Sequence, residues 1–223
     1  MTAIEYISNQ LQFLFPPLCK DLNCSDLDLL LLAKDESDDR FSYLANQVSI
    51  LSRTGVSPNP LHIMKSPIYL YILAVVIFEK GWSDEVNIKN RLYCLNKAIN
   101  GCSIYYKIKM PRVFFLNYAS GIVLGNCVYG ENLVVYQGVT VGGFGNKIPV
   151  IGNNVILMPN VVVSGASVIG DNVVISAGVN VINKIVPDNT IVFNGAVRGS
   201  ELNLRKLDST QYIDYYINST NLG

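Results

Sequence analysis

The sequence predicts an α+β chain, in which an all-helical N-terminal domain over residues 1–109 precedes a parallel β-helix over residues 110–197. Two observations support this prediction: apolar residues recur at helical spacing before residue 110 and at a six-residue interval after it. A period of six fits neither an α-helix nor the alternation of a simple strand, but it fits a coil with three flat sides. Residues 198–223 lose both periods and are predicted to be a polar C-terminal tail with one short helix around residues 202–207.

The helical half contains four shorter candidate helices: residues 4–15, residues 25–34 with Ser25 as the cap, residues 41–51, and the apolar run from Ile68 to Phe78. The clearest pattern follows the candidate cap Ser83, with apolar residues three or four apart at Ile88, Leu92, Leu95, Ile99, Cys102 and Tyr106. This spacing predicts one amphipathic helix of about twenty residues.

In the second half, one apolar set recurs every six residues: Ile151, Leu157, Val163, Ile169, Ile175 and Val181. A second set stands four places after each of these: Val155, Val161, Ser167, Val173, Val179 and Ile185. We expect both sets to point into a triangular prism and to stack on their equivalents in neighbouring coils. A β-sandwich is the alternative, but sandwich strands are not held to a fixed six-residue spacing.

The register extends backwards less regularly through Leu124, Tyr129, Val135 and Val141, with Val128, Leu133 and Val139 as the inward partners. The stretch "GGFGNKIPV", residues 142–150, is predicted to be a loop that leaves the coil. Apolar residues also occupy outward positions, at Ile156, Val162, Val168 and Val174. We expect these residues to be buried against another subunit, because a monomer rarely exposes a large apolar patch.

Composition excludes several classes of protein. Seventeen basic and seventeen acidic residues cancel, and no basic stripe interleaved with aromatics is present, so nucleic acid is not an expected partner. The longest apolar run is too short to cross a membrane, which takes about 20 residues, and no secretory signal is visible. The five cysteines form no C-x-x-C pair and one histidine cannot complete a zinc site, so we expect no metal, reduced thiols and a cytoplasmic protein.

The helical half leads through "LNKAINGCSIYYKIKMPRVFF" into "GIVLGNCVYGENLVVYQGVTVGG". With the hexads, this stretch resembles the left-handed parallel β-helix acyltransferases over roughly residues 111–197. It resembles more closely the serine O-acetyltransferase family, including relatives encoded with surface-polysaccharide genes, over most of residues 60–197. The resemblance implies a left-handed coil, acetyl-CoA as the acyl donor, and homotrimers, often paired into hexamers, with active sites between neighbouring prisms.

The resemblance also assigns coenzyme-binding positions. Gly142 and Gly143 in "VGG", and Ala177 and Gly178 in "SAG", align with positions that line the coenzyme groove, where small side chains leave room for pantetheine. Pro159 stands where the family usually has a small residue, and it lacks a backbone donor. For each glycine, a plain turn is the competing interpretation.

The expected catalytic pair is replaced. Where the family carries an acidic residue followed by a histidine that deprotonates the acceptor, this chain has Asn117 and Tyr118, and a second family histidine aligns with Ile148. General base catalysis is typically worth about 10² to 10⁴ in rate, and an ordinary phenol is only about 0.1% ionised at pH 7. The only histidine, His62 in "NPLHIMKSP", is either the surviving base or acceptor contact, or a hydrogen-bonded residue at a helix start.

Two functional hypotheses follow. The first is an acetyl-CoA-dependent O-acetyltransferase that acts on serine or on a sugar hydroxyl of a surface polysaccharide, with a small-molecule or glycan acceptor and a degenerate acid–base site. The second is a non-catalytic trimeric binding or assembly homologue that has lost the active-site histidine. An engineered change at Tyr118 is a third interpretation that the sequence leaves open.

Overall fold

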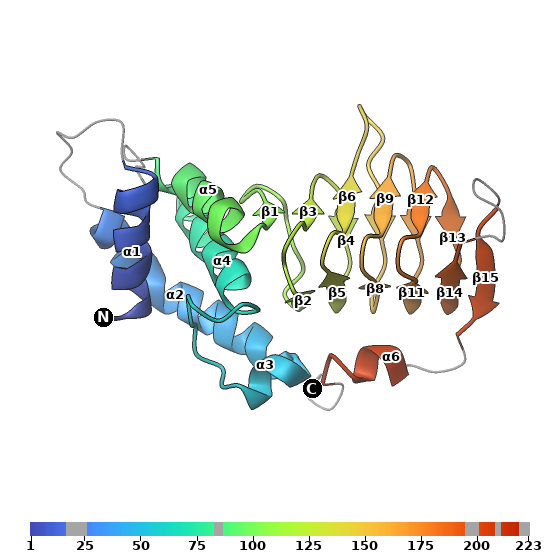
Figure 1. Cartoon of the computed structure of the whole chain (residues 1–223), viewed down its shortest axis with the longest axis horizontal. Coiled ribbons are helices and arrows are strands. Elements are labelled where there is room, and N and C mark those ends of the chain that lie inside the picture. The colour runs from blue at the N-terminus through green and yellow to red at the C-terminus, as the bar shows by residue number, and fades with distance from the viewer. Residues whose placement is uncertain (17–25, 83–86, 195–200, 208–210, 219–223) are drawn as a thin grey trace.

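A computed structural model describes residues 1–16, 26–82, 87–194, 201–207 and 211–218, without the side chain of Gln211 (Figure 1). Some predictions made above lie outside these ranges: the caps Ser25 and Ser83, the thiols of Cys19 and Cys24, and the end of the β-helix at Val197. Within them, a cluster of helices leads into a long prism of short strands (Figure 1).

The helical half comprises α1 (Ala3–Leu14), α2 (Asp26–Gln47), α3 (Ser49–Arg53), α4 (Ser66–Glu79) and α5 (Ile88–Asn100). The predicted helices at residues 25–34 and 41–51 are wrong as separate elements, because α2 runs through the polar stretch between them. Ion pairs one turn apart stabilise that stretch: Lys34 lies 2.8 Å from Asp38, and Arg40 pairs with Glu36. The helix from residue 41 therefore continues α2 to Gln47, and α3 follows after Val48.

The helix predicted to run for about twenty residues is shorter. α5 ends at Gly101, whose φ of 64° lies in the left-handed region that glycine adopts without strain. Cys102 and Tyr106 are buried beyond this end, so their spacing reflects packing rather than helix. The apolar run predicted as a buried helix is confirmed as α4, which is buried on nearly all sides. In the described residues, no helix is both long and apolar enough to span a bilayer.

The prism has three faces, each a sheet of parallel strands from successive coils (Figure 1). Face 1 contains β1 (Ser103–Ile104), β3 (Val123–Leu124), β6 (Thr140–Gly142), β9 (Val162–Ser164) and β12 (Asn180–Ile182). Face 2 contains β4 (Val128–Tyr129), β7 (Val150–Ile151), β10 (Val168–Ile169) and β13 (Ile185–Val186). Face 3 contains β2 (Phe114–Asn117), β5 (Leu133–Tyr136), β8 (Ile156–Leu157), β11 (Val173–Ile175) and β14 (Thr190–Phe193), with β15 (Asn203–Lys206) added antiparallel.

The predicted interior is confirmed at most hexad positions, including the polar Ser167, which is fully buried with Oγ 2.7 Å from the Ser164 carbonyl oxygen. The prediction that Ile185 points inward is wrong: its side chain is 76% exposed, and Val186 is buried in its place. The coil from Val168 to Ile185 is one residue shorter than the coil from Val162 to Asn180, and a one-residue slip turns every following side chain over.

The same error affects the first coil. Val128 was predicted to point inward but is 53% exposed, and Cys127 is buried instead. The predicted loop after Gly142 is confirmed: residues 143–149 leave the coil, and Phe144 and Lys147 exchange backbone hydrogen bonds of 2.9 and 3.1 Å.

The corner between faces 2 and 3 explains the repeated asparagines. Asn132, Asn154, Asn172 and Asn189 all have positive φ, a conformation that asparagine tolerates better than most residues. Their side chains form a ladder, with N–H···O distances of 2.8, 2.8 and 3.1 Å along the prism. This ladder satisfies side-chain amides that would otherwise compete with the strands.

The C-terminal tail folds back along face 3. The helix predicted around residues 202–207 is instead strand β15, and the chain then forms α6 (Gln211–Asp214) and returns toward α3 (Figure 1). The Tyr216 ring packs 6.4 Å from Phe115 and 6.1 Å from Tyr136 on face 3. The Tyr216 carbonyl accepts a 2.8 Å hydrogen bond from Ser49 N, which joins the tail to the helical half.

This arrangement corrects part of the subunit-contact prediction. On face 3, Ile156 and Val174 are only 1% and 4% exposed, so the chain itself buries them. On the other two faces, Val162 is half-buried and Val168 remains 40% exposed.

Candidate functional site

The structure gathers five of the predicted site residues along the corner between faces 3 and 1. Asn117 ends β2 and Tyr118 follows it, Pro159 follows β8, and Ala177 and Gly178 follow β11. The parallel pairing of these strands stacks their ends in successive coils. One corner therefore carries the predicted catalytic pair and three of the predicted coenzyme contacts.

Tyr118 has an unusual backbone for an aromatic residue. Its φ of 54° is positive, as in the stacked turn residues Gly121, Gly138, Asn160 and Gly178, but Gly121 and not Tyr118 is the residue that stacks on Gly138. Glycine and asparagine adopt this conformation readily, whereas a bulky residue there costs roughly 1–3 kcal/mol. The Tyr118 side chain is nevertheless 52% exposed, so no burial in this chain offsets the strain. A strained, exposed aromatic at this place is a candidate for contact with a ligand.

Beside Tyr118, two amide oxygens lack partners. Asn117 is only 8% exposed, yet its Oδ1 accepts no hydrogen bond from any described residue, and Gln137 Oε1 is in the same position. Asn117 pairs with Tyr136 in the sheet, so Gln137 lies in the adjacent coil. A buried acceptor without a donor costs about 1–3 kcal/mol. Both oxygens have therefore lost water without gaining a donor, which makes them candidates for a hydrogen bond only if a side chain turns toward a bound molecule.

Gln137 was not predicted. The only signal in the sequence is a glutamine at the outward corner position of "VVYQG", directly before a turn glycine. Its relation to Asn117 comes from the strand register, in which Asn117 pairs with Tyr136 nineteen residues later rather than the eighteen that three hexads would give.

This corner carries no charge in the described coils: residues 117–120, 136–139, 158–161 and 176–179 include no acid, base or histidine. The site can therefore recognise a ligand through shape and hydrogen bonds. It has no ion pair to offer to a charged one. The backbone N–H of Ala177 has no backbone partner among the described residues. The next N–H, that of Gly178, donates a 2.9 Å hydrogen bond to the Pro159 carbonyl.

The remaining predicted glycines lie at the other edge of face 1. Gly142 has an ordinary φ, and a Cβ added to it meets no atom within 4 Å, so nothing inside the chain requires glycine there. Gly143 differs, because its Cβ would lie 2.6 Å from the Lys147 carbonyl oxygen, and the loop explains this glycine. Gly178 combines a φ of 71° with open space around it. Because β6 and its neighbours separate the two corners, one chain does not bring all predicted coenzyme contacts together.

His62 lies in the turn before α4, in the helical half. Its Nδ1 accepts a 3.2 Å hydrogen bond from Met64 N, which leaves the proton of the neutral ring on Nε2. Burial, and secondarily Lys65, lower the pKa of His62 below its ordinary value. No hydrogen bond within the described part of the chain joins His62 to Asn117 or Tyr118, so the structure does not group it with them.

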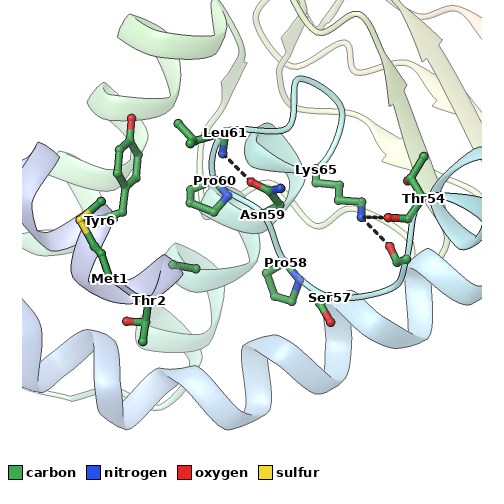
Figure 2. A pocket seen from close by; sticks show the side chains of 12 residues that line it. Met1, Thr2, Tyr6, Thr54, Ser57, Pro58, Asn59, Pro60, Leu61 and Lys65 are labelled. Atoms are coloured by element: carbon green, nitrogen blue, oxygen red, sulfur yellow. Dashed lines mark hydrogen bonds between the residues drawn. The ribbon is translucent and has the colours of Figure 1, made fainter.

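Two cavities lie away from the corner. Figure 2 shows the first, of about 520 Å³, between the start of α1 and the loop before α4, where buried Lys65 donates to the carbonyls of Thr54 and Gly55. The second is a groove of about 750 Å³ between α2, α4 and residues 106–112. Neither cavity is lined by a predicted site residue. Across the described ranges, no group of three or more His, Cys, Asp or Glu residues is placed to hold a metal ion.

Comparison with known proteins gives three findings. Residues 148–183 match the family described as bacterial transferase hexapeptide (six repeats). The serine acetyltransferase of Synechococcus elongatus is 32% identical over 103 residues, which cover 44% of this chain and 42% of that protein. The serine acetyltransferase of Staphylococcus xylosus is 33% identical over 116 residues, 47% of this chain and 54% of that protein. The chain thus spans about half the length of the curated relatives it matches.

Solved structures share the fold over most of the chain. The serine acetyltransferase of Vibrio cholerae superposes with a TM-score of 0.68 at 18% identity, covering 95% of this chain and 81% of that one. The Brucella abortus enzyme, solved in complex with coenzyme A, gives 0.61 at 20% identity, covering 92% and 82%. The predicted fold is confirmed, and the repeats are serine acetyltransferase-like in sequence.

Proposed function

We propose that this chain, whose repeats are similar to those of serine acetyltransferases, is an acetyl-CoA-dependent O-acetyltransferase. The observation that carries the proposal is Gly142, a glycine that no turn and no internal contact requires, beside open space at the edge of face 1. A solved structure neighbour from Brucella abortus holds coenzyme A, which supports the same class of donor here.

The coenzyme groove is proposed to form between two copies of the chain. Gly142 lies at one edge of face 1, and Ala177 and Gly178 lie at the other, so one corner from each of two neighbouring prisms would complete the groove. Face 2 supplies a surface for this contact: its register partners Val128, Val150, Val168 and Ile185 are 53%, 38%, 40% and 76% exposed. A row of exposed β-branched residues on a flat sheet favours burial by another copy. A three-sided prism with one such face suits a homotrimer, and pairing of trimers into hexamers remains part of the proposal.

In the proposed reaction, the acceptor hydroxyl attacks the thioester carbonyl, the C–S bond breaks, and coenzyme A leaves as the thiol. With a turn of its side chain, Asn117 or Gln137 would present its amide oxygen to a hydroxyl of the acceptor and orient the acceptor for attack. The Ala177 N–H is a donor without a backbone partner among the residues that the structure describes. The hydroxyl proton passes to solvent, either directly or through Tyr118, which would accept this proton as it gives up its own, and the departing thiolate takes a proton in turn. His62, the other candidate base, lies in the helical half and not at this corner. Positioning supplies most of the rate.

For the acceptor, we favour a neutral sugar hydroxyl of a surface polysaccharide over serine. Serine carries an ammonium and a carboxylate, and each needs a charged or strongly hydrogen-bonding partner once water is removed. The corner around Tyr118 offers no such charge. Serine remains the alternative, because the curated relatives are named serine acetyltransferases.

The second candidate function is a non-catalytic binding or assembly protein. It is favoured by one observation: Asn117 and Tyr118 leave the corner without any group that titrates near neutral pH. The fold, the exposed face 2 and the space at Gly142 would then serve binding alone.

We place the protein in the cytoplasm, as the cysteines suggest. Cys94, Cys102 and Cys127 are free thiols, and burial raises the pKa of both Cys102 and Cys127 to about 12. Thiols whose pKa is raised by burial are unreactive, so in this proposal Cys102 and Cys127 act only as small buried hydrophobic residues.

Calorimetric titration with acetyl-CoA and with CoA tests the proposal, followed by release of free thiol in the presence of serine, nucleotide sugars and glycans. Binding and acceptor-dependent thiol release are expected, with Gly142→Val abolishing binding while thermal unfolding stays unchanged. Asn180→Val, in the last strand of face 1, is the matched control. Absence of binding would overturn the proposal. Binding without turnover on any acceptor would favour the non-catalytic alternative. Loss of turnover in the Tyr118→Phe variant would argue against that alternative.

A further inference from the structure

The groove between α2, α4 and residues 106–112 has a composition that acetyl transfer does not explain. It measures about 750 Å³, within the usual range for small-molecule sites, and lies where the helical half meets the first coil. Its walls are unusually aromatic: Tyr43, Tyr71, Phe78, Tyr106 and Phe114. Tyr71, Tyr106 and Phe114 are only 6%, 7% and 2% exposed, so Tyr43 and Phe78, each 39% exposed, supply the accessible aromatic surface on which a planar ring would stack.

Three cations are carried on the segment that forms one side of this groove. Lys107, Lys109 and Arg112 are exposed, and none forms an ion pair with a residue that the structure describes. The Arg112 guanidinium lies 4.2 Å from the Tyr43 ring centroid, and Lys107 Nζ lies 5.7 Å from that of Phe78. The positive charges and the aromatic rings therefore occupy the same site.

The carboxylates of the groove do not cancel these charges. Among the groove's lining residues, Glu79 is paired with Arg40 at 2.8 Å, which leaves Asp39 to oppose three cations; Glu131, outside the lining, accepts from the backbone of Arg112 and Val113. The excess is positive in a chain whose total charge is zero, so it is a local feature. A dianionic ligand would complement it.

The cationic segment is held in place before any ligand arrives. Tyr71 Oη donates a 2.5 Å hydrogen bond to the Ile108 carbonyl and accepts one of 3.3 Å from Met110 N. The Glu131 carboxylate accepts from the backbone N–H groups of Arg112 and Val113, both at 3.2 Å. A preformed backbone lowers the entropy that binding must overcome.

We propose that this groove binds a nucleoside diphosphate. The base would stack on the aromatic wall, as bases do on tyrosine, phenylalanine and arginine planes, and the diphosphate would meet Lys107, Lys109 and Arg112. A nucleic-acid strand is the less favoured occupant, since no basic track continues beyond the groove along a neutral chain. This binding does not depend on the acetyl-transfer proposal, because none of the corner residues lines the groove.

The test is calorimetric titration of the full chain with uridine diphosphate and with adenosine diphosphate, each first without coenzyme A and then in the presence of saturating coenzyme A. Coenzyme A is included because it carries an adenosine diphosphate unit of its own, and its separate titration reports on the acetyl-transfer proposal. We expect at least one nucleotide to bind with a Kd below about 100 µM. Arg112→Gln and Lys109→Gln should each weaken it about tenfold. Lys184→Gln, between β12 and β13, is the charge-matched control and should change nothing.

Titrations with pyrophosphate and with the free nucleosides complete the experiment. Pyrophosphate alone should bind at least about tenfold more weakly than the nucleotide, because it lacks the stacking ring. The inference is overturned if neither nucleotide binds at millimolar concentration, or if Lys184→Gln weakens binding as much as Arg112→Gln. Equal affinity for pyrophosphate and nucleotide would also overturn it, by showing a simple anion site.

Discussion

Two faces of the same prism carry apolar side chains outward, and they differ in what covers them. On face 3, Ile156 and Val174 are almost fully buried, and the returning tail packs Tyr216 on the same sheet. On face 2, Val168 and Ile185 are exposed although they occupy equivalent outward positions. The repeat alone therefore does not decide whether the outward apolar residues of a face are buried within the chain. A segment outside the repeat does.

The difference also assigns separate roles to the faces. Face 3 is satisfied within the chain and is joined to the helical half through Tyr216 and Ser49. Face 2 keeps its outward apolar residues exposed. Face 1 lies between the corner of Tyr118 and the edge at Gly142, and its outward residues are mixed: Thr140 is polar, whereas Val123 and Ile182 are 43% and 50% exposed.

The largest effect is expected from uncovering face 3. Ile217 is 4% exposed and pairs with Val48, so Ile217→Asp places a carboxylate in the contact between the tail and the helical half. We expect a loss of about 3–5 kcal/mol of unfolding free energy, because an unpaired charge is buried. Denaturant unfolding measures it. The control is Tyr215→Asp at a 75% exposed neighbour, which should cost less than about 0.5 kcal/mol. Equal losses in both variants would show that the tail does not cover the face.

A charge on face 2 should act on assembly instead. Val168 is 40% exposed at the middle of the row, so Val168→Lys should leave the unfolding free energy of the chain within about 0.5 kcal/mol. Association of copies should weaken by at least about tenfold, because a desolvated lysine would lie in the proposed contact. Sedimentation analysis at several concentrations measures this. An unchanged oligomer would show that copies meet elsewhere.

The outcome of the sequence predictions follows the same division. The hexad rule predicted the prism and most of its interior, because a six-residue period has few other solutions. It failed at Ile185 and Val128, where a coil is one residue short and an apolar neighbour of the predicted residue fits the new register. The tail could not be assigned to face 3, since only contacts distant in sequence place it there.

For the candidate site, the sequence predicted one corner and missed how it is completed. Asn117, Tyr118, Pro159, Ala177 and Gly178 do share an edge of the prism. Gln137 was missed, and for Gly143 the loop supports the competing interpretation that the sequence had left open, a plain structural glycine. Backbone strain at Tyr118 was also invisible, because φ follows from the coil and not from the residue type.

Relieving the backbone strain at Tyr118 should have a smaller effect, raising the unfolding free energy while lowering acceptor turnover. Asparagine tolerates the left-handed region, so Tyr118→Asn should raise the unfolding free energy by about 1 kcal/mol. If Tyr118 contacts the acceptor, the same variant should lose acceptor turnover while coenzyme binding persists. Thermal unfolding and thiol release on one preparation measure both. A stabilised variant with full turnover would remove Tyr118 from the site.

The smallest effect concerns His62 in the helical half, where burial lowers the pKa of the imidazole. Because the unfolded chain then binds the proton more readily than the folded chain, stability should fall as the pH drops below the unfolded value of about 6.5. His62→Gln should remove this contribution, by less than about 1 kcal/mol between pH 7 and pH 5, while leaving stability above pH 7 nearly unchanged. Unfolding midpoints across this pH range measure the difference. A steeper acid loss in the variant would mean that protonated His62 stabilises the fold, against the direction that its burial implies.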